Sequence, residues 1–408
     1  MGMYLVHFKS RDLTRLQKQG QFWHIIFSNG GVIIAQDEID TWTAHLPIPL
    51  DEDTSKIDPK ETVYNVLGSH TGRYPIEIDE ILVSSAWRAN LVVADEYRTE
   101  KGRVFLAGDS AHQNIPTGGY GMNMGVGDAY DIGWKLAAAL EGYGGEYLLE
   151  SYSAERRPVA FRNVECSGVY QKVHWQFGTW AREAGEDVLL SQDVVGIALK
   201  TKMRDYILSN DGENKNHGNE MGYRHTESPV VEFRDGEVAP EWNPRSYVAS
   251  TYPGARAPHV FMSDLKTSIH DLFGKYYTVV DFTPDGNTSA AFSAVAQHLK
   301  IPLKKLHLPN EPHVRNIWER DVVLIRPDAF VAWRSAADPL LQECNDTEVI
   351  RRILLAAVGQ IKSSSYRPAP KSEASRLGNL PTFSASVANI DQDTSVIQKL
   401  AVFQGGSE

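Results

Sequence analysis

The sequence predicts an α/β protein with a strand-rich first part and a later part in which strands and helices alternate. Residues 20–28 and 31–36 are rich in aromatic and β-branched side chains, and the Asn29-Gly30-Gly31 run between them is typical of a hairpin. In the later part we expect strands at 276–282, 322–325 and 329–333 and helices at 288–298 and 347–358. Alternation of this kind indicates an α/β domain.

Length and composition favour a globular protein of more than one domain. The chain has 408 residues, of which 42% are hydrophobic and 23% are charged, so at roughly 150 residues per domain we expect two or three domains. Lys and Arg number 41 against 52 Asp and Glu, which gives a net charge of −11. Because no block of basic residues offsets this acidity, we expect neither a nucleic-acid partner nor a polybasic membrane anchor.

The cysteines and the first residues predict the compartment. Cys166 and Cys344 lie far apart and form no metal-binding spacing, so we expect no metal site, no disulfide framework and a reducing environment. No apolar run approaches the roughly 18 residues that a membrane helix needs. Residues 1–10 lack the basic and apolar regions of a signal peptide. The expected location is therefore cytoplasmic.

The segment from Arg103 to Leu140 carries the chemistry. A strand expected at 103–107 ends at Asp109, which places a carboxylate at a sheet edge where ligands bind in open α/β folds. The loop that follows is suited to close approach of a ligand, with Pro116, Gly118, Gly119 and Gly121. A helix expected to begin near Met122 offers N–H groups and partial positive charge to an anionic group. The glycine spacing does not fit the dinucleotide fingerprint G-x-G-x-x-G.

This segment resembles the second FAD-contact region of the flavin-dependent aromatic hydroxylases, the family of phenol hydroxylase and para-hydroxybenzoate hydroxylase. The match rests on Gly108-Asp109-Ser110-Ala111-His112 and on Pro116-Thr117-Gly118-Gly119-Tyr120-Gly121-Met122-Asn123. The resemblance implies FAD contacts at Asp109, Pro116, Gly118, Gly119, Tyr120, Gly121, Met122 and Asn123. It implies that Asp109 holds the ribityl chain and that the helix start lies against the flavin ring. Catalysis would then be carried by the flavin, with no protein nucleophile and no metal.

Other parts of the chain resemble the same family. The strands near Gln36, Trp42 and His45 resemble the sheet that forms the substrate pocket, and these side chains are the candidate substrate contacts. Residues 254–259 and 325–334 resemble the thioredoxin-like C-terminal domain of phenol-hydroxylase-type members. That domain lacks a redox Cys-x-x-Cys, and its implied role is packing and contact within a homodimer.

The expected organisation follows from these motifs. We expect a truncated FAD- and substrate-binding domain at 1–180, a partly helical connector at 181–250, a thioredoxin-like domain at 251–360 and a flexible tail at 361–408. His112 is interpreted as a helix-start or packing residue. The Glu155-Arg156-Arg157 run is interpreted as a helix-surface or helix–sheet ion pair.

One feature of the family has no counterpart in this sequence. The family's FAD domain opens with a β-α-β unit whose G-x-G-x-x-G motif holds the pyrophosphate, and no such motif lies near residue 1. The chain therefore resembles a member without its AMP-binding half, and we expect its affinity for FAD to be low. The resemblance implies an FAD-dependent monooxygenase that hydroxylates a phenolic or aromatic substrate with NAD(P)H and O2, compatible with secondary metabolism. The alternative is a non-catalytic remnant, a scaffold or dimer partner that has lost FAD.

Overall fold

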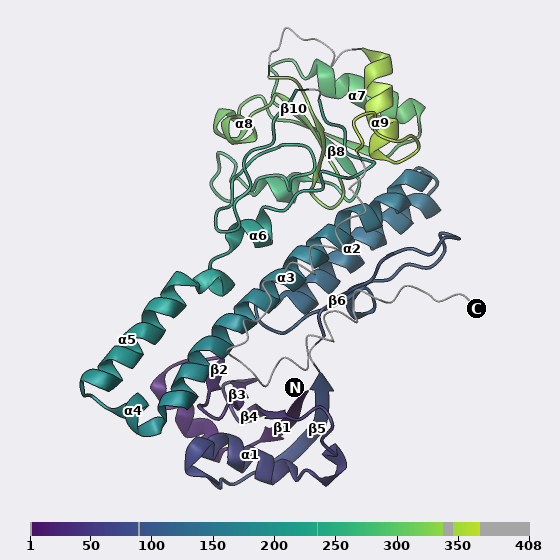
Figure 1. Cartoon of the computed structure of the whole chain (residues 1–408). Coiled ribbons are helices and arrows are strands. Elements are labelled where there is room, and N and C mark those ends of the chain that lie inside the picture. Colours follow the sequence, from purple (N-terminus) through teal and green to yellow (C-terminus); the bar gives the residue numbers. More distant parts are fainter. Residues whose placement is uncertain (1, 89, 235, 338–345, 368–408) are drawn as a thin grey trace. The chain divides into compact units, whose positions relative to one another are not determined.

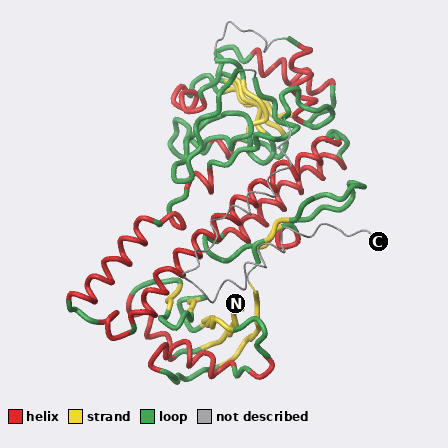
Figure 2. The backbone as a smooth tube through the Cα atoms, in the orientation of Figure 1, coloured by secondary structure: helices red, strands yellow, loops and turns green. Residues whose placement is uncertain are grey.

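The computed structural model describes residues 2–88, 90–234, 236–337 and 346–367 (Figure 1). By its internal contacts the chain divides into two units. The first holds residues up to 90, 115–117 and 168–211, and the second holds the remainder. Helices and sheets are both present, so the predicted mixed α/β class is confirmed (Figure 2). The four domain bounds stay a prediction, and the expected tail lies outside the described residues from 368 onward.

The first unit contains an antiparallel sheet with strand order β2-β3-β4-β1-β5. Its strands are β1 (Gly2–Lys9), β2 (His24–Ile26), β3 (Val32–Ala35), β4 (Thr41–Ile48) and β5 (Glu80–Arg88). Alternate residues of β1 are buried, because successive side chains of a strand point to opposite faces. One face packs against helix α1 (Pro59–Gly68), whose Val63 and Val66 join Val6 and Trp42 in a hydrophobic core.

Local sequence explains the boundaries of these elements. The expected hairpin is confirmed: Gly30 has a φ of 83° and its N–H donates to the carbonyl of Phe27 at 2.9 Å. Helix α1 begins after Asp58, whose carboxylate accepts hydrogen bonds from the next turn, with Pro59 in the first helical position. The unit also holds α4 (Glu186–Leu190) and α5 (Val194–Ser209), the latter capped by Asp193.

Two long helices organise the second unit. Helix α2 (Tyr120–Leu140) confirms the helix expected after the glycine-rich loop. Helix α3 (Glu146–Ala184) runs beside it (Figure 1) and continues into the first unit from residue 168. Pro158 lies inside this helix, which continues through it. Packing of the buried face of α3 against neighbouring elements contributes more stability than the single hydrogen bond that proline removes.

The C-terminal part of the second unit is a four-stranded sheet with order β11-β10-β8-β9. The strands are β8 (Tyr277–Asp281), β9 (Leu303–His307), β10 (Val322–Ile325) and β11 (Val331–Arg334). β8 and β9 are parallel and the other neighbours are antiparallel, which is the topology of the expected thioredoxin-like domain. β8, β10 and β11 are buried throughout, because α7 (Asn287–His298) and α9 (Thr347–Ala357) cover one face and α8 (Pro312–Trp318) the other.

Short elements complete the described chain. They are β6 (Val92–Val93), β7 (His112–Gln113), α6 (His217–Met221) and the 3₁₀ helices η1 (Asp12–Gln19), η2 (Thr54–Lys56), η3 (Ser69–Thr71), η4 (Gly108–Ser110), η5 (Asp211–Asn214) and η6 (Ile269–Leu272). The strand expected at 103–107 was wrong. Phe105 makes only an isolated bridge with Arg98, so this segment reaches η4 as an extended loop. Among the helices of the described ranges, none combines the length and apolar character needed to cross a membrane.

Candidate functional site

The Gly-Asp motif lies on a short loop that packs against helix α2. Gly108 has a φ of 57°, a left-handed conformation that favours glycine, and Asp109 is exposed on η4. A Cβ atom built on Gly125 of α2 would lie 3.4 Å from the Cα of Gly108. Two glycines therefore let the loop approach the helix closely, while the Asp109 carboxylate faces solvent.

The start of α2 is open to a ligand. Gly119 caps the helix with a φ of 68°, and a Cβ atom built on it would meet no atom within 4 Å. Met122 is 79% exposed and Asn123 is also exposed, with the Asn123 amide donating to the carbonyl of Gly119 at 2.8 Å. The first turn of a helix carries N–H groups without intrahelical partners and a partial positive charge. This end can therefore accept an anionic or electron-rich group.

Other predicted FAD contacts have structural roles in this loop. The side chain of Tyr120 is buried and its hydroxyl accepts a hydrogen bond from Asn219 at 3.1 Å, so the expected FAD contact of this residue stays a prediction. The N–H of Gly118 donates to Glu213 at 2.9 Å. Gly121 lies close to Asn114, because a Cβ atom there would be 3.3 Å from the amide oxygen of Asn114. Pro116 is exposed and belongs to the segment 115–117 of the first unit.

A buried carboxylate holds the Gly-Asp loop. Asp128 of α2 is 1% exposed and accepts hydrogen bonds from the N–H of Gly108 at 3.1 Å, from Nε2 of His112 at 2.8 Å and from Nε of Arg156 at 2.8 Å. Burial disfavours the ionised form, but the hydrogen bond from His112 and the charge of Arg156 outweigh it and lower the pKa of Asp128. The carboxylate is therefore ionised at neutral pH.

His112 is buried, as the packing interpretation expected. Because Asp128 is an acceptor, the ring donates from Nε2, and Nδ1 has no hydrogen-bond partner in the described part of the chain. The hydroxyl of Tyr97 is likewise buried without a partner there, and its ring centroid lies 6.5 Å from that of His112. No local sequence pattern indicated the contact between His112 and Asp128, since these residues are 16 positions apart.

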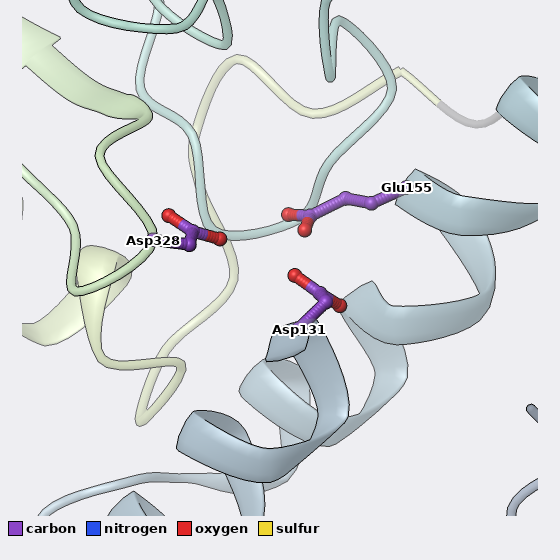
Figure 3. Close-up of side chains that lie close together, drawn as sticks. All are labelled: Asp131, Glu155 and Asp328. Atoms are coloured by element: carbon purple, nitrogen blue, oxygen red, sulfur yellow. The ribbon is translucent and has the colours of Figure 1, made fainter. Parts of the chain in front are cut away.

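A second buried cluster joins α2 and α3 to the turn between β10 and β11. Figure 3 shows the carboxylates of Asp131, Glu155 and Asp328 close together. Lys135 bonds Asp131 at 2.7 Å and Glu155 at 2.6 Å, and Arg326 bonds Glu155 at 2.6 Å. Although three carboxylates so close could hold a metal ion, these two side-chain cations already neutralise most of their charge.

Burial and the neighbouring charges shift the pKa values of the carboxyl groups in this cluster. Burial raises the pKa of Asp131 to about 7. Burial also opposes ionisation of Glu155, but Arg326 and Lys135 overcome it and hold the pKa of Glu155 well below its usual range. The ion-pair interpretation of the Glu155-Arg156-Arg157 run is thus confirmed for Glu155 and Arg156, and both are buried rather than on the helix surface.

The candidate substrate residues do not share one face of the first unit's sheet. His45 pairs with Leu5 of β1 on the face away from the core, and Gln36 reaches the same face, where its amide bonds the hydroxyl of Thr43 at 2.9 Å. Trp42 points the other way: it is fully buried and its indole N–H donates to the carbonyl of Ser10 at 3.1 Å. Trp42 therefore lies in the core, on the face opposite to His45, because alternate strand residues face opposite sides.

Sequence reasoning missed two residues on this face, His7 and Trp87. Nδ1 of His7 lies 2.9 Å from the hydroxyl of Thr43. The indole N–H of Trp87 donates to Nδ1 of His45 at 3.3 Å, with the two rings edge to face. Burial lowers the pKa of His45, so its ring is neutral at neutral pH. Since an indole N–H can only donate, the proton of His45 resides on Nε2. Period-two alternation along 2–9 could have revealed His7.

Comparisons with known proteins show the family to which the chain belongs. Residues 1–167 match the family model of an FAD binding domain, and residues 250–359 match that of the aromatic-ring hydroxylase C-terminal domain. The FAD-dependent monooxygenase opdD of Penicillium oxalicum is 41% identical, over 88% of this chain and 69% of that protein. The chain belongs to the FAD-dependent aromatic-ring hydroxylase family. A second member, the FAD-dependent monooxygenase apdD of Emericella nidulans, is 43% identical, over 81% of this chain and 55% of that protein.

Two enzymes whose structures were solved with a flavin have a fold similar to that of this chain. The flavin-dependent monooxygenase PieE, solved with FAD and substrate, aligns with a TM-score of 0.71 at 26% identity, covering 87% of this chain and 66% of that one. The rebeccamycin biosynthetic enzyme RebC, solved with reduced flavin, aligns with a TM-score of 0.70 at 27% identity, over 88% and 63%. The chain thus spans between about half and two thirds of the length of the family members it matches.

The residues present fit the part of FAD that this family would place against them. The matched FAD-binding model includes Asp109, the helix start at Gly119–Asn123 and the buried Asp128. Asp109 supplies an exposed carboxylate that can accept from hydroxyl groups, and no atom lies within 4 Å of a Cβ atom built on Gly119. The partial positive charge of the helix start suits an electron-rich ring edge.

Proposed function

We propose that this chain carries the flavin-contact and substrate-contact parts of an FAD-dependent monooxygenase that hydroxylates a phenolic or aromatic compound with NAD(P)H and O2, in secondary metabolism. FAD, when bound, supplies the redox and oxygen chemistry. The observation that carries the proposal is the exposed pair of Asp109 and the α2 start, held in place by the buried Asp128. Relatives named FAD-dependent monooxygenases support it.

Separate residues of the chain bind the cofactor and the substrate in this proposal. Asp109 binds the ribityl hydroxyls, and the N–H groups at the start of α2 stabilise negative charge on the flavin ring edge. On the first unit, His45 presents its Nε2–H to an oxygen atom of the substrate, because Trp87 occupies its Nδ1. A hydrogen bond to a phenolic oxygen orients the ring and favours its electron-rich, deprotonated form. Phenol 2-monooxygenase of a Pseudomonas, 29% identical, acts on such a compound by name.

Flavin binding by the purified chain tests the proposal directly. The chain is titrated with FAD, and bound flavin is measured by fluorescence quenching and by its visible absorbance. Bound chain is then tested for NADH or NADPH consumption that depends on added phenols. Asp109→Ala should weaken FAD binding by about tenfold, the effect of about 1.4 kcal/mol. Asp285→Ala, which removes an exposed carboxylate from a turn of the C-terminal domain, is the matched control and should bind FAD like the wild type.

The alternative is decided by the same titration. A chain that binds no FAD at any concentration would contradict the proposal for this polypeptide and favour the non-catalytic scaffold. Equal FAD affinities of Asp109→Ala and the wild type would show that the Gly-Asp loop is not the flavin contact. Binding of FAD without any phenol-dependent NAD(P)H consumption would support the FAD site but contradict the proposed hydroxylation of a phenol.

A further inference from the structure

Asp128 bonds both ends of the loop that carries Asp109. One of its carboxylate oxygens, Oδ2, accepts from the N–H of Gly108 at 3.1 Å and from Nε2 of His112 at 2.8 Å. Gly108 precedes Asp109 and His112 follows it, so a single buried atom fixes the segment on either side of the exposed side chain. Within this segment the N–H of Ala111 also donates to the carbonyl of Gly108 at 2.8 Å, which closes the turn.

The other oxygen of Asp128 is fixed from helix α3. Arg156 is 4% exposed and donates from Nε to Oδ1 at 2.8 Å and from Nη2 to the carbonyl of Met124 at 3.3 Å. Gly127 makes room for this arginine, because a Cβ atom there would lie 2.7 Å from Nη2. Gly127 therefore leaves space for the Arg156 side chain, and the Asp128 carboxylate links this arginine to the loop that carries Asp109.

Only an ionised carboxylate satisfies these three donors together. It offers acceptor positions on both oxygens and carries no proton of its own. An asparagine in its place would turn an N–H₂ group toward either Arg156 or the Gly108 and His112 donors. At least one buried donor would then lose its partner, and buried donors without partners are costly. The local geometry thus requires aspartate at this position of α2.

We propose that Asp128 is a positioning residue of the flavin site, holding the Gly108–His112 loop so that the Asp109 carboxylate is presented to the ligand. It does not contact the ligand itself, since it is buried beneath the loop. Arg156 acts with it by fixing the orientation of the carboxylate. This inference rests on the proposed function for the identity of the ligand, but the positioning of the loop is a property of the chain alone.

Asp128→Asn tests the inference, with Asp131→Asn as its matched control. Asp131 lies one turn further along α2, is also buried, and makes its contacts with Lys135 and Arg326 instead of the loop. The first measurement is hydrogen–deuterium exchange of the segment 107–113 in the chain without FAD. The second is the dissociation constant for FAD, from flavin fluorescence quenching. We expect Asp128→Asn to raise exchange in this segment and the dissociation constant by about tenfold or more each. Asp131→Asn should change neither.

The two measurements separate the inference from the proposed function. Wild-type exchange rates in Asp128→Asn would overturn the inference even if FAD binds. Faster exchange together with an unchanged dissociation constant would overturn it as well, because the loop would then not matter to the ligand. If the wild-type chain binds no FAD, the proposed function fails and the role in the flavin site fails with it, while exchange still decides whether Asp128 holds the loop.

A second pair of variants covers the case in which Asp128→Asn does not fold. His112→Leu removes the donor to Asp128, whereas His112→Gln keeps a side-chain N–H in a similar place. Faster exchange at 107–113 and weaker FAD binding in His112→Leu, with recovery of both in His112→Gln, support the inference. A merely space-filling role of His112 would give the opposite order, because leucine restores apolar packing and glutamine does not.

Discussion

Arg326, on the turn between β10 and β11, donates hydrogen bonds of 2.6 and 2.8 Å to the two carboxylate oxygens of Glu155 on α3. The two residues are 171 positions apart and both side chains are fully buried. The same turn accepts hydrogen bonds from the Tyr130 hydroxyl at 2.9 Å and from the Trp134 indole at 3.1 Å. The thioredoxin-like domain is thus joined to helix α2, whose first turn follows the Gly-Asp loop in the sequence.

Breaking the Arg326–Glu155 pair should destabilise the chain severely. Arg326→Met leaves the Glu155 and Asp131 carboxylates with only Lys135 between them, and removing one partner of a buried ion pair costs about 3–5 kcal/mol. Urea unfolding measured by circular dichroism gives the loss directly. Arg351→Met, at an exposed position of α9, is the control and should change the free energy of unfolding by less than about 0.5 kcal/mol. Equal losses in the two variants would contradict the role assigned to Arg326.

The buried Asp131 should make stability depend on pH. Because burial raises its pKa from 3.8 to about 7, the folded chain holds a proton between these values that the unfolded chain has released. Its contribution to the free energy of unfolding therefore falls as pH rises toward 7. His225 acts in the opposite sense, because burial lowers its pKa from 6.5 to about 3, so the unfolded chain binds the extra proton and stability rises with pH.

A difference measurement isolates Asp131 from His225. The free energy of unfolding of Asp131→Asn, minus that of the wild type, should rise by on the order of 2 kcal/mol between about pH 5 and pH 7. The reason is that the variant has no proton to lose there, whereas the His225 contribution is common to both chains and cancels. Lys135, Glu155, Arg326 and Asp328 face Asp131. Glu155 and Asp328, whose pKa values are lowered, and Arg326, whose pKa is raised, stay charged in this range. A difference independent of pH would show that Asp131 is ionised throughout.

Two glycines should respond to alanine in opposite directions. Gly359, after α9, has a φ of 72°, and a Cβ atom there would lie 2.1 Å from the backbone nitrogen of Leu148. Gly359→Ala should therefore cost about 3 kcal/mol or more, from backbone strain and overpacking. Gly133, in the middle of α2, has nothing within 4 Å of a built Cβ, so Gly133→Ala should stabilise the chain by about 0.5–1 kcal/mol. Thermal unfolding of both variants checks the pair; a destabilised Gly133→Ala would contradict the packing of α2.

A phenol probe should report on the face of the sheet that carries His45. Binding of 4-nitrophenol should quench the fluorescence of Trp87, which contacts His45, and Trp87→Phe should remove that part of the signal. His45→Phe should weaken binding about tenfold, the effect of losing one hydrogen bond to the phenolic oxygen. His24→Phe, on the opposite edge strand β2, is the control and should bind as the wild type does. Equal affinities of the two histidine variants would contradict the substrate role of His45.

Local patterns determined much of the fold. The hairpin at Gly30, the helix after Gly119 and the buried strands of the C-terminal domain follow from glycine placement, helical spacing and apolar runs, which act over a few residues. The same locality explains the errors. Residues 103–107 have strand composition but no partner strand for a ladder. Strand β9 carries two successive exposed lysines, Lys304 and Lys305, which hide its strand pattern.

The sequence by itself determined that Asp109 and the glycine-rich start of α2 form one motif, because a motif is defined by residues that are neighbours along the chain. Only the tertiary structure decided what holds that motif. Asp128 meets His112 and Arg156, and Glu155 meets Arg326, across separations that no spacing rule connects. Likewise, Trp42 and His45 share a strand, but only the packing of α1 on one face decided that Trp42 lies in the core and His45 outside it. Burial decides both results. A charged side chain needs a partner, and a strand face becomes core, only where another part of the chain covers it.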